Sequence, residues 1–356
     1  MLIGVSGTIF SGKQEIVRYL SYQGFSYVSL DDPNNKNFSS LPPGIKQKPS
    51  PSDIFPEVTF HSVSELLEYV TKNWEENIVV MPVNNYSVVE ELSVRPFFLH
   101  LIVDGSSKIR YQRFKKKCSK IEISPESSSI TLCETNNTEY PPLSFEDFVE
   151  LSEQNINFFA QSHSTTTYTP TVKVINNTTT VKDLYVQLSS LNIFDPLRLR
   201  PNWDTYFMKL ANLAALRSNC MKRRVGCVIV KDNRVIATGY NGTPRHLKNC
   251  NQGGCKRCNN TSSGGEALST CLCLHAEENA LLESGRDRVT SDHGSKCILY
   301  CNTCPCLTCS IKIIQCGISE VVYSQSYSMD SSSKKILNEA GIGLRQFSPP
   351  KDVITT

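Results

Sequence analysis

The sequence has no apolar run long enough to cross a membrane, and it has little net charge. A membrane-spanning helix needs about 20 consecutive apolar residues, and the 356-residue chain carries a formal net charge of only +3. A protein that follows nucleic-acid phosphates usually presents a broad positive surface, which this balance does not supply. We therefore expect neither a membrane nor a nucleic acid as a partner.

Cysteine is nearly absent from the first half of the chain, where only Cys118 and Cys133 occur, whereas the others lie between Cys220 and Cys316. A secreted disulfide framework would explain many cysteines. The segment 1–10, however, lacks the basic and long apolar regions of a secretion signal. Clustered thiols without such a signal indicate metal ligands in a reducing compartment. We expect a cytoplasmic protein, with the nucleus as an additional location.

Strand-like and helical patterns alternate along the first half, which predicts an α/β layer fold. Short apolar runs predict buried strands at 78–81, 97–103 and 171–175. Helical spacing of apolar residues predicts helices at 63–71, 108–117, 145–159 and 181–191. The two prolines in 194–201 indicate a domain boundary, so we expect one domain over 1–195 and a second over 196–356.

The second half also alternates between the two patterns. Strands are predicted at 225–230, 235–240, 297–300 and 320–323. Helices are predicted at 203–217, 275–284, 306–316 and 332–340. This half is therefore expected to be a second α/β domain.

A glycine loop near the amino terminus has the spacing of a phosphate-binding P-loop. Gly7, Gly12 and Lys13 have the spacing of the motif Gly-x-x-x-x-Gly-Lys, and they lie after a predicted strand and before a predicted helix. Position 14 is Gln14 instead of Ser or Thr, so the hydroxyl that normally holds magnesium is missing. We expect no phosphoryl transfer. Regulatory nucleotide binding at this loop and an inert scaffold in which Lys13 is surface charge both remain open.

Four residues of the second half have the types and spacing of a catalytic zinc site. His275 is followed two residues later by Glu277, and Cys306 and Cys309 follow Pro305 about thirty residues further on. One histidine and two cysteines supply three zinc ligands, and catalytic sites keep the fourth position for water. The pattern H-x-E…P-C-x-x-C is the signature of zinc-dependent nucleobase deaminases, with the glutamate as proton shuttle.

This spacing predicts hydrolytic removal of an amino group. Zinc lowers the pKa of a coordinated water, and Glu277 is expected to take its proton and pass it to the ring nitrogen and the departing ammonia. The alternative is a closed structural site in which Cys273 or Cys304 supplies a fourth ligand. The glutamate and the proline at their signature positions favour the catalytic interpretation.

A second group of cysteines precedes the histidine. Cys255 and Cys258 form a C-x-x-C pair in a loop rich in glycine and asparagine, with Cys220, Cys250, Cys271 and Cys273 nearby in the sequence. Such pairs are typical of structural zinc sites. We expect a second, non-catalytic zinc on four of the six, although free thiols are the alternative. Spacing does not decide which four; our choice is Cys220, Cys255, Cys258 and Cys273.

From residue 203 to about residue 347 the chain resembles deoxycytidylate deaminases, and more particularly their fungal form. The resemblance is carried by the segments 217–220, 224–230, 239–244, 249–255, 274–281 and 305–309. It implies a three-layer α/β/α deaminase fold and the conversion of dCMP and water to dUMP and ammonia, which supplies dUMP for thymidylate synthesis. It also implies a homo-oligomer, often a hexamer, activated by dCTP and inhibited by dTTP, with Mg²⁺ accompanying a nucleotide effector.

The resemblance also implies roles for single residues. His275, Cys306 and Cys309 are then the zinc ligands and Glu277 the proton shuttle. Asn241 is expected to hydrogen-bond the sugar, and Tyr327 to approach the substrate phosphate. Arg223 and Arg224 lie where basic residues meet a nucleotide phosphate, although an exposed basic pair before a strand explains them equally well.

The first half also resembles a known enzyme family. Residues 97–104 and the helix bearing Arg110 and Arg113 resemble small P-loop kinases such as dephospho-coenzyme A kinase, which implies a degenerate P-loop kinase fold for the first half.

Two alternative functions remain for the chain. The first is that of another deaminase of the superfamily, which would act on tRNA adenosine, cytidine or a riboflavin precursor. A catalytically silent regulatory protein is the alternative of a different class, and the intact His-Glu-Cys-Cys set argues against it.

Overall fold

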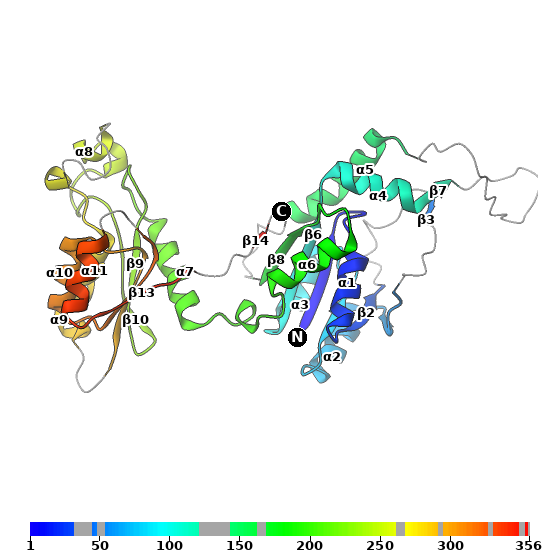
Figure 1. The fold of residues 1–356 in the computed structure, drawn as a ribbon, viewed down its shortest axis with the longest axis horizontal. Helices are drawn as coiled ribbons and strands as arrows, with labels where there is room; N and C mark the ends of the chain where they lie inside the picture. Colours follow the sequence, from blue (N-terminus) through cyan, green and yellow to red (C-terminus); the bar gives the residue numbers. More distant parts are fainter. Residues whose placement is uncertain are drawn as a thin grey trace, which may run out of the picture. The chain divides into compact units, whose positions relative to one another are not determined.

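The computed structural model describes residues 1–31, 45–47, 54–120, 143–161, 169–260, 268–290, 295–326, 330–348 and 353–354. The chain divides into two compact units, one of Met1–Arg200 with Lys351–Thr356 and one of Pro201–Pro350. Figure 1 shows a separate sheet in each unit. The boundary predicted after residue 195 falls in the same proline-containing segment, next to the short 3-10 turn Pro196–Arg198.

Unit 1 is built on a seven-stranded sheet in which every pairing is parallel. Its strand order is β14-β8-β6-β1-β5-β2-β4. In that order the strands are Val353–Ile354, Thr171–Ile175, Phe98–Asp104, Leu2–Gly7, Ile78–Val80, Ser26–Leu30 and Val58–Phe60. A parallel sheet is covered on both faces, which explains the nearly uninterrupted apolar runs of β1, β5 and β6. A separate antiparallel pair joins β3 (Ile45–Gln47) to β7 (Cys118–Lys120).

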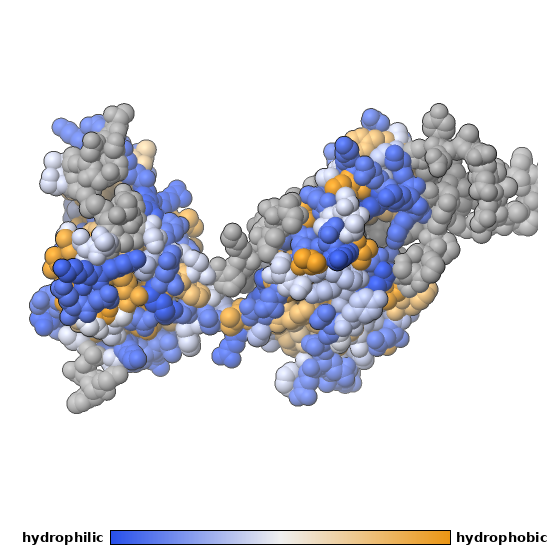
Figure 2. Space-filling model, in the orientation of Figure 1, coloured by the Kyte–Doolittle hydropathy of each residue, from blue (hydrophilic) through white to orange (hydrophobic). Residues whose placement is uncertain are grey.

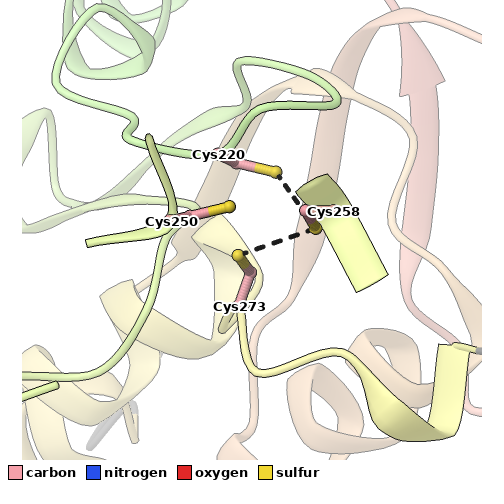
Figure 3. Close-up of side chains that lie close together, drawn as sticks. All are labelled: Cys220, Cys250, Cys258 and Cys273. Carbon is pink, nitrogen blue, oxygen red and sulfur yellow. Dashed lines mark hydrogen bonds between the residues drawn. The ribbon is translucent and has the colours of Figure 1, made fainter. Parts of the chain in front are cut away.

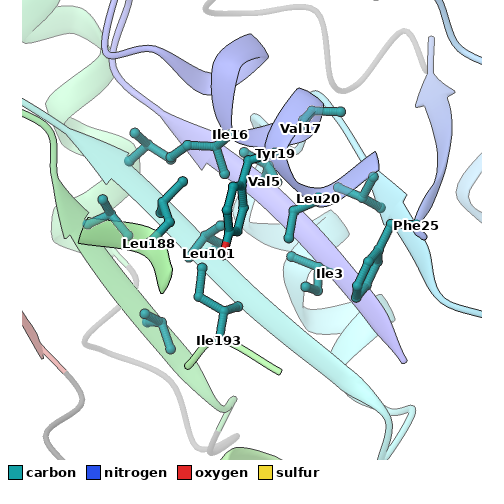
Figure 4. Packing of buried hydrophobic residues seen from close by; sticks show 14 of the residues in the cluster. Ile3, Val5, Ile16, Val17, Tyr19, Leu20, Phe25, Leu101, Leu188 and Ile193 are labelled. Atoms are coloured by element: carbon teal, nitrogen blue, oxygen red, sulfur yellow. The ribbon is translucent and has the colours of Figure 1, made fainter. Parts of the chain in front are cut away.

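Helices cover both faces of this sheet. Alternate side chains of β1 and β5 point to opposite faces, as the period of two in a strand requires. Ile3 packs with α1 (Lys13–Tyr22) and α6 (Val181–Leu191) on one face (Figure 4). Val79 belongs to the same cluster. Leu2 and Ile78 pack with α2 (Val63–Lys72) and α3 (Tyr86–Ser93) on the other. The remaining helices are α4 (Ser107–Lys117) and α5 (Phe145–Gln161).

Unit 2 has a mixed five-stranded sheet in the order β10-β9-β11-β12-β13. In that order the strands are Arg234–Tyr240, Gly226–Lys231, Cys297–Thr303, Glu320–Gln325 and Gly343–Gln346. Strand β9 is antiparallel to both β10 and β11, whereas β11, β12 and β13 are parallel. Strands β10, β11 and β12 therefore all end at one edge of the sheet, and β9 begins there.

In the described part of unit 2, one helix covers one face of this sheet and three cover the other. Helix α7 (Trp203–Ala215) packs Phe207 and Met208 against Val228 and Tyr300. The opposite face is covered by α9 (Ala276–Val289), α10 (Leu307–Cys316) and α11 (Asp330–Glu339). Together the units confirm the predicted α/β class, with a parallel sheet in the amino-terminal unit and a mixed sheet between two helical layers in the carboxy-terminal unit.

A glycine brings the helix that begins at the predicted zinc ligand close to the sheet. A Cβ atom at Gly239 of β10 would lie 2.1 Å from the carbonyl oxygen of Ala276 and 2.5 Å from the backbone nitrogen of Ala280. Only glycine permits this approach, because real Cβ contacts are never so short. The first turns of α9 are thus held directly against β10.

Figure 2 shows hydrophilic and hydrophobic residues interspersed over the visible face of each unit. Scattered apolar residues are ordinary on a protein surface. Within the part of the chain that the structure describes, the helices are too short or too polar to span a membrane.

Candidate active site

The three predicted zinc ligands come together at the starts of two neighbouring helices. His275 is the N-cap of α9, Cys306 is the N-cap of α10, and Cys309 lies in the first turn of α10. The Nδ1 atom of His275 is 3.4 Å from Sγ of Cys306 and 3.3 Å from Sγ of Cys309. All three ligand atoms lie within 4.8 Å of one another, so one ion can contact all of them.

The position of the two sulfurs favours a negative charge on the pair. Both lie at the amino-terminal end of α10, where the helix dipole stabilises negative charge. A hydrogen bond with Cys309 and another with His275 lower the pKa of Cys306 to about 4, against the opposing effect of burial. The pKa of the Cys309 thiol is raised instead, mainly by its hydrogen bond with Cys306 and then by burial.

Glu277 lies beside these ligands without being one of them. Its side chain is buried, with 4 % of the residue exposed, and burial is the main cause that raises the pKa of its carboxyl group. The neighbouring His275 and Cys309 act against this rise, whereas the group within ligand distance contains only His275, Cys306 and Cys309 among the described residues. A buried carboxyl group next to a metal site, with no role as ligand, is placed to move protons.

The donor set fits zinc. One imidazole nitrogen and two thiolates match the ligands of zinc sites that bind and activate water, whereas structural sites use four protein ligands. Cys273, an alternative for the fourth ligand, has its sulfur 3.9 Å from Sγ of Cys258 in a different group. Cys304, the other alternative, is also not among the described residues whose ligand atoms group with His275. These placements favour the predicted three-ligand site over the closed one.

Glu278, which was not among the predicted site residues, connects the two helices. The backbone N–H of His275 donates to Oε2 of Glu278 at 3.0 Å, which completes a capping box at the start of α9. The other carboxylate oxygen of Glu278 pairs with Lys312 of α10. Glu278 therefore holds the two ligand-bearing helices together. Its spacing of three residues from the N-cap His275 was the available signal.

The loop after β10 is fastened to the residue before the histidine. Gly242 and Leu274 exchange two backbone hydrogen bonds, of 3.2 and 2.9 Å. The amide of Asn241 is engaged internally: Oδ1 accepts from the hydroxyl of Ser218 at 2.7 Å and from the N–H of Val225 at 2.8 Å. Its Nδ2 donates to the carbonyl of Arg223 at 2.8 Å. The second hydrogen on Nδ2 is therefore the part of the Asn241 amide that remains available to contact a sugar.

Comparison with known proteins agrees with this geometry. Residues 201–325 match the family model of the cytidine and deoxycytidylate deaminase zinc-binding region. The chain is 42 % identical to a deoxycytidylate deaminase of Schizosaccharomyces pombe, with 99 % of each chain covered. It is 45 % identical to a deoxycytidylate deaminase of Saccharomyces cerevisiae, covering 98 % of this chain and 97 % of that one. The chain belongs to the deoxycytidylate deaminases.

A solved deoxycytidylate deaminase is also similar to part of the chain. It comes from the cyanophage S-TIM5, in complex with dCMP and dUMP, and is 29 % identical with a TM-score of 0.33. The match covers 42 % of this chain and 98 % of the phage chain.

The basic pair of this deaminase lies at the sheet edge where the zinc ligands are found. Arg223 donates to Oε1 of Gln325 at 2.8 Å, and Gln325 ends β12 beside the loop that leads to Cys306. The backbone carbonyl of Gln325 also accepts from the N–H of Cys304 at 2.9 Å. Arg224 is exposed. Tyr327 lies outside the described residues, so its predicted phosphate contact stays a prediction.

Six further cysteines of the deaminase unit gather into two overlapping groups. Cys220, Cys250, Cys258 and Cys273 form one group (Figure 3), and Cys255, Cys258, Cys271 and Cys273 form the other. In each, all four sulfurs lie within 4.8 Å of one another. Our chosen set of Cys220, Cys255, Cys258 and Cys273 corresponds to neither group, because the structure places Cys220 and Cys255 in different ones.

The predicted P-loop of unit 1 is held by its own lysine and by side chains from two other segments. Lys13 donates to the carbonyl oxygens of Gly7 at 2.6 Å and Thr8 at 2.9 Å. The carbonyl of Ser11 accepts from Arg113 at 3.1 Å and from the amide of Asn176 at 2.8 Å. Lys13 is thus a half-buried cation, and desolvation of its ammonium group lowers its pKa to about 8. A Cβ atom at Gly12 would lie 2.5 Å from Nδ2 of Asn176, so the loop needs glycine for packing as well as for any phosphate.

Proposed function

We propose that this chain deaminates dCMP to dUMP and ammonia at the site formed by His275, Cys306, Cys309 and Glu277. The observation that carries the proposal is the approach of Nδ1 of His275 to both sulfurs, at 3.3 and 3.4 Å, with the buried Glu277 beside them. The chain's membership in the deoxycytidylate deaminases supports dCMP as the substrate.

The reaction replaces one bond at the pyrimidine ring with another. Zinc held by His275, Cys306 and Cys309 supplies a Lewis acid that lowers the pKa of water. Glu277 accepts the two protons of the attacking water one after the other, and delivers the first to the ring nitrogen and the second to the departing amino group. The new C–O bond forms as the C–N bond to the amino group breaks, and ammonia leaves. The burial of Glu277 keeps bulk water away from this proton path.

Recognition of the nucleotide is assigned to the edge of the sheet around the zinc ligands. Arg223 and Arg224 precede β9, Asn241 follows β10 and Tyr327 follows β12 in the sequence. Because β10 and β12 end at the edge where β9 begins, this arrangement supports phosphate binding by the arginines and Tyr327 and sugar binding by Asn241. Arg223, held by Gln325, is the more fixed of the two arginines.

Assembly and regulation form the second part of the proposal. We infer a homo-oligomer, often a hexamer in this family, that dCTP with Mg²⁺ activates and dTTP inhibits. The exposed apolar residues Leu307 and Ile311 of α10 and Leu282 of α9 support burial of this surface by another subunit. The thiols of the described cysteines are all free, which supports a reducing compartment such as the cytoplasm or nucleus.

The activity is tested by measuring ammonia release from dCMP, CMP, deoxycytidine and adenosine in RNA, with and without dCTP. We expect turnover of dCMP in preference to the others and stimulation by dCTP. Activity confined to adenosine in RNA or to deoxycytidine would contradict the proposed substrate.

The role of Glu277 is tested by Glu277→Gln. The variant is expected to keep its zinc and to lose at least about 10²-fold in kcat, because proton transfer by a positioned side chain contributes at least that factor. Glu283→Gln is the matched control, since Glu283 is an exposed glutamate on the same helix. Zinc content and kcat are measured for both. Near-normal turnover by the zinc-loaded Glu277 variant would remove the glutamate from the mechanism.

A further inference from the structure

The cysteine cluster, defined as Cys220, Cys250, Cys255, Cys258, Cys271 and Cys273, is distinct from the catalytic ligands. Its two groups of four share Cys258 and Cys273. Cys220 and Cys250 belong only to the first group, and Cys255 and Cys271 only to the second. Four of the six are buried and the other two are partly buried, so the sulfurs form a small closed core.

The distances between the sulfurs match those around tetrahedral zinc. A Zn–S bond of about 2.3 Å places two sulfurs of one tetrahedron about 3.8 Å apart. The distances from Sγ of Cys258 are 3.8 Å to Cys220, 3.6 Å to Cys271 and 3.9 Å to Cys273. Cys255 lies 3.9 Å from Cys271. A disulfide would require about 2.05 Å, and all six thiols are free.

We propose that the cysteine cluster binds two zinc ions, with Cys258 and Cys273 bridging them. Cys220 and Cys250 complete the tetrahedron of one ion, and Cys255 and Cys271 complete that of the other. Two tetrahedral ions that share two thiolates require six sulfurs, which is the number the structure gathers. A single ion would use four and leave two thiols of this core without a metal.

The groups around the six sulfurs suit a metal–thiolate cluster that carries a net negative charge. Six thiolates outweigh the charge of two divalent ions, so the sulfurs need hydrogen-bond donors and a cation. The backbone N–H groups of Met221 and Leu272 donate to Cys250 at 3.5 Å and Cys255 at 3.4 Å. The guanidinium of Arg257 lies 3.9 Å from Sγ of Cys271. These contacts serve sulfurs of both groups.

The position of the cluster indicates what the two ions would do. Cys273 is two residues before His275, and the intervening Leu274 pairs with Gly242. The segment from Cys250 to Cys273 contributes five of the six sulfurs. In its described parts, 250–260 and 268–273, the helices are the short α8 (Lys256–Asn259) and two single-turn 3-10 helices. Metal ligation therefore supplies the core that this segment lacks and anchors the chain that leads to His275.

The first test is metal analysis of the full-length protein purified without chelators. We expect about three zinc ions per chain, one at the catalytic site and two in the cluster. After replacement of zinc by ¹¹³Cd, NMR should show two signals from all-sulfur sites, coupled to each other through the shared thiolates, and one from the His275 site. About two ions per chain, or a single all-sulfur signal, would overturn the two-ion proposal. About one ion would exclude any cluster metal.

The second test separates bridging from terminal thiols. Each of Cys220→Ser and Cys271→Ser is expected to lower the zinc content by about one ion, whereas Cys258→Ser should lower it by about two. Cys316→Ser is the control, because Cys316 lies on α10 outside both groups. If either Cys220→Ser or Cys271→Ser leaves the zinc content unchanged, a single site explains the cluster.

The cluster and the proposed activity can fail separately. Glu277→Gln should retain about three zinc ions although it no longer deaminates dCMP. A protein that turns over dCMP with about one zinc ion per chain refutes the cluster alone. The wild-type metal count and the ¹¹³Cd spectrum do not depend on whether a cysteine variant folds.

Discussion

Glu278 is a single residue whose two oxygens act on different helices. One accepts the N–H of His275 at 3.0 Å, and the other pairs with Lys312 of α10. The first contact fixes the backbone of a zinc ligand, and the second fixes the helix that carries Cys306 and Cys309. Groups that orient metal ligands in this way affect metal affinity without touching the metal.

Replacement of Glu278 is therefore expected to weaken zinc binding more than it affects proton transfer. Glu278→Ala should lower zinc affinity by about 10–100-fold and destabilise unit 2 by about 1 kcal/mol through loss of the cap. Competition with a chelator measures the affinity, and kcat at saturating zinc measures the chemistry. Glu278→Gln keeps the cap and should recover part of the affinity. Unchanged zinc affinity in the alanine variant would contradict this role.

His100 is a buried residue whose environment makes the stability of unit 1 depend on pH. It lies on β6 with 2 % of its surface exposed, and its Nε2 is 2.7 Å from the hydroxyl of Ser6. Burial lowers its pKa from 6.5 to about 4. Between these values the unfolded chain binds a proton that the folded chain does not, so stability falls as the pH falls.

The expected loss from His100 between pH 6.5 and pH 4 is at most about 3 kcal/mol, since each unit of pKa difference corresponds to about 1.4 kcal/mol. Above pH 6.5 its contribution is constant. Urea unfolding across this range should give a shallower pH dependence for His100→Gln than for the wild type. His61→Gln, at an exposed position of the same unit, should retain the wild-type slope. Equal slopes for both variants would exclude His100 as the cause.

At the scale of elements, the sequence predicted best where spacing within one element fixes geometry. Cys306 and Cys309 lie three residues apart at the start of a helix, so their sulfurs share one side. The predicted helix over 275–284 is present, but α9 continues to Val289 because Gly285, with φ of 66°, turns the chain and a further helical turn follows.

Elements fixed by tertiary contacts were harder to predict. Strands β2 and β4, helix α3 and strand β13 were missed; they are short and are stabilised by neighbours far away in the sequence. The grouping of the six cysteines depends on how irregular segments fold over one another, which cysteine spacing does not encode. The internal hydrogen bonds of Asn241 likewise come from Ser218, Arg223 and Val225, whose proximity only the fold establishes.

The P-loop is an element whose hydrogen bonds argue for a structural role. Lys13 donates to two carbonyls of its own loop, so a phosphate has to replace these bonds before Lys13 can bind it. We expect Lys13→Met to lower the melting temperature while leaving dCMP turnover and its dCTP response unchanged. Lys72→Met removes an exposed lysine of the same unit. It should leave the melting temperature, dCMP turnover and the dCTP response unchanged. Loss of the dCTP response in a folded Lys13 variant would instead make the loop a phosphate site.

At the scale of the whole molecule, the proposed assembly predicts that the apolar surface on α9 and α10 is buried between subunits. Leu282 is 72 % exposed and Ile311 is 56 % exposed, although both belong to helices that pack against the sheet. A charge placed in such an interface has to be desolvated without a partner, which costs several kcal/mol. Ile311→Asp should therefore shift the protein to smaller species in size-exclusion chromatography with light scattering.

The control for this prediction is Val186→Asp, which charges an exposed apolar position of unit 1 on α6. It should elute with the wild type. Because Ile311 lies on the same helix as Cys306 and Cys309, zinc content is measured alongside, so that a loss of assembly is distinguished from a damaged metal site. A monomeric wild type, or an Ile311→Asp variant that keeps its zinc and the wild-type mass, would place the subunit contacts elsewhere or remove them.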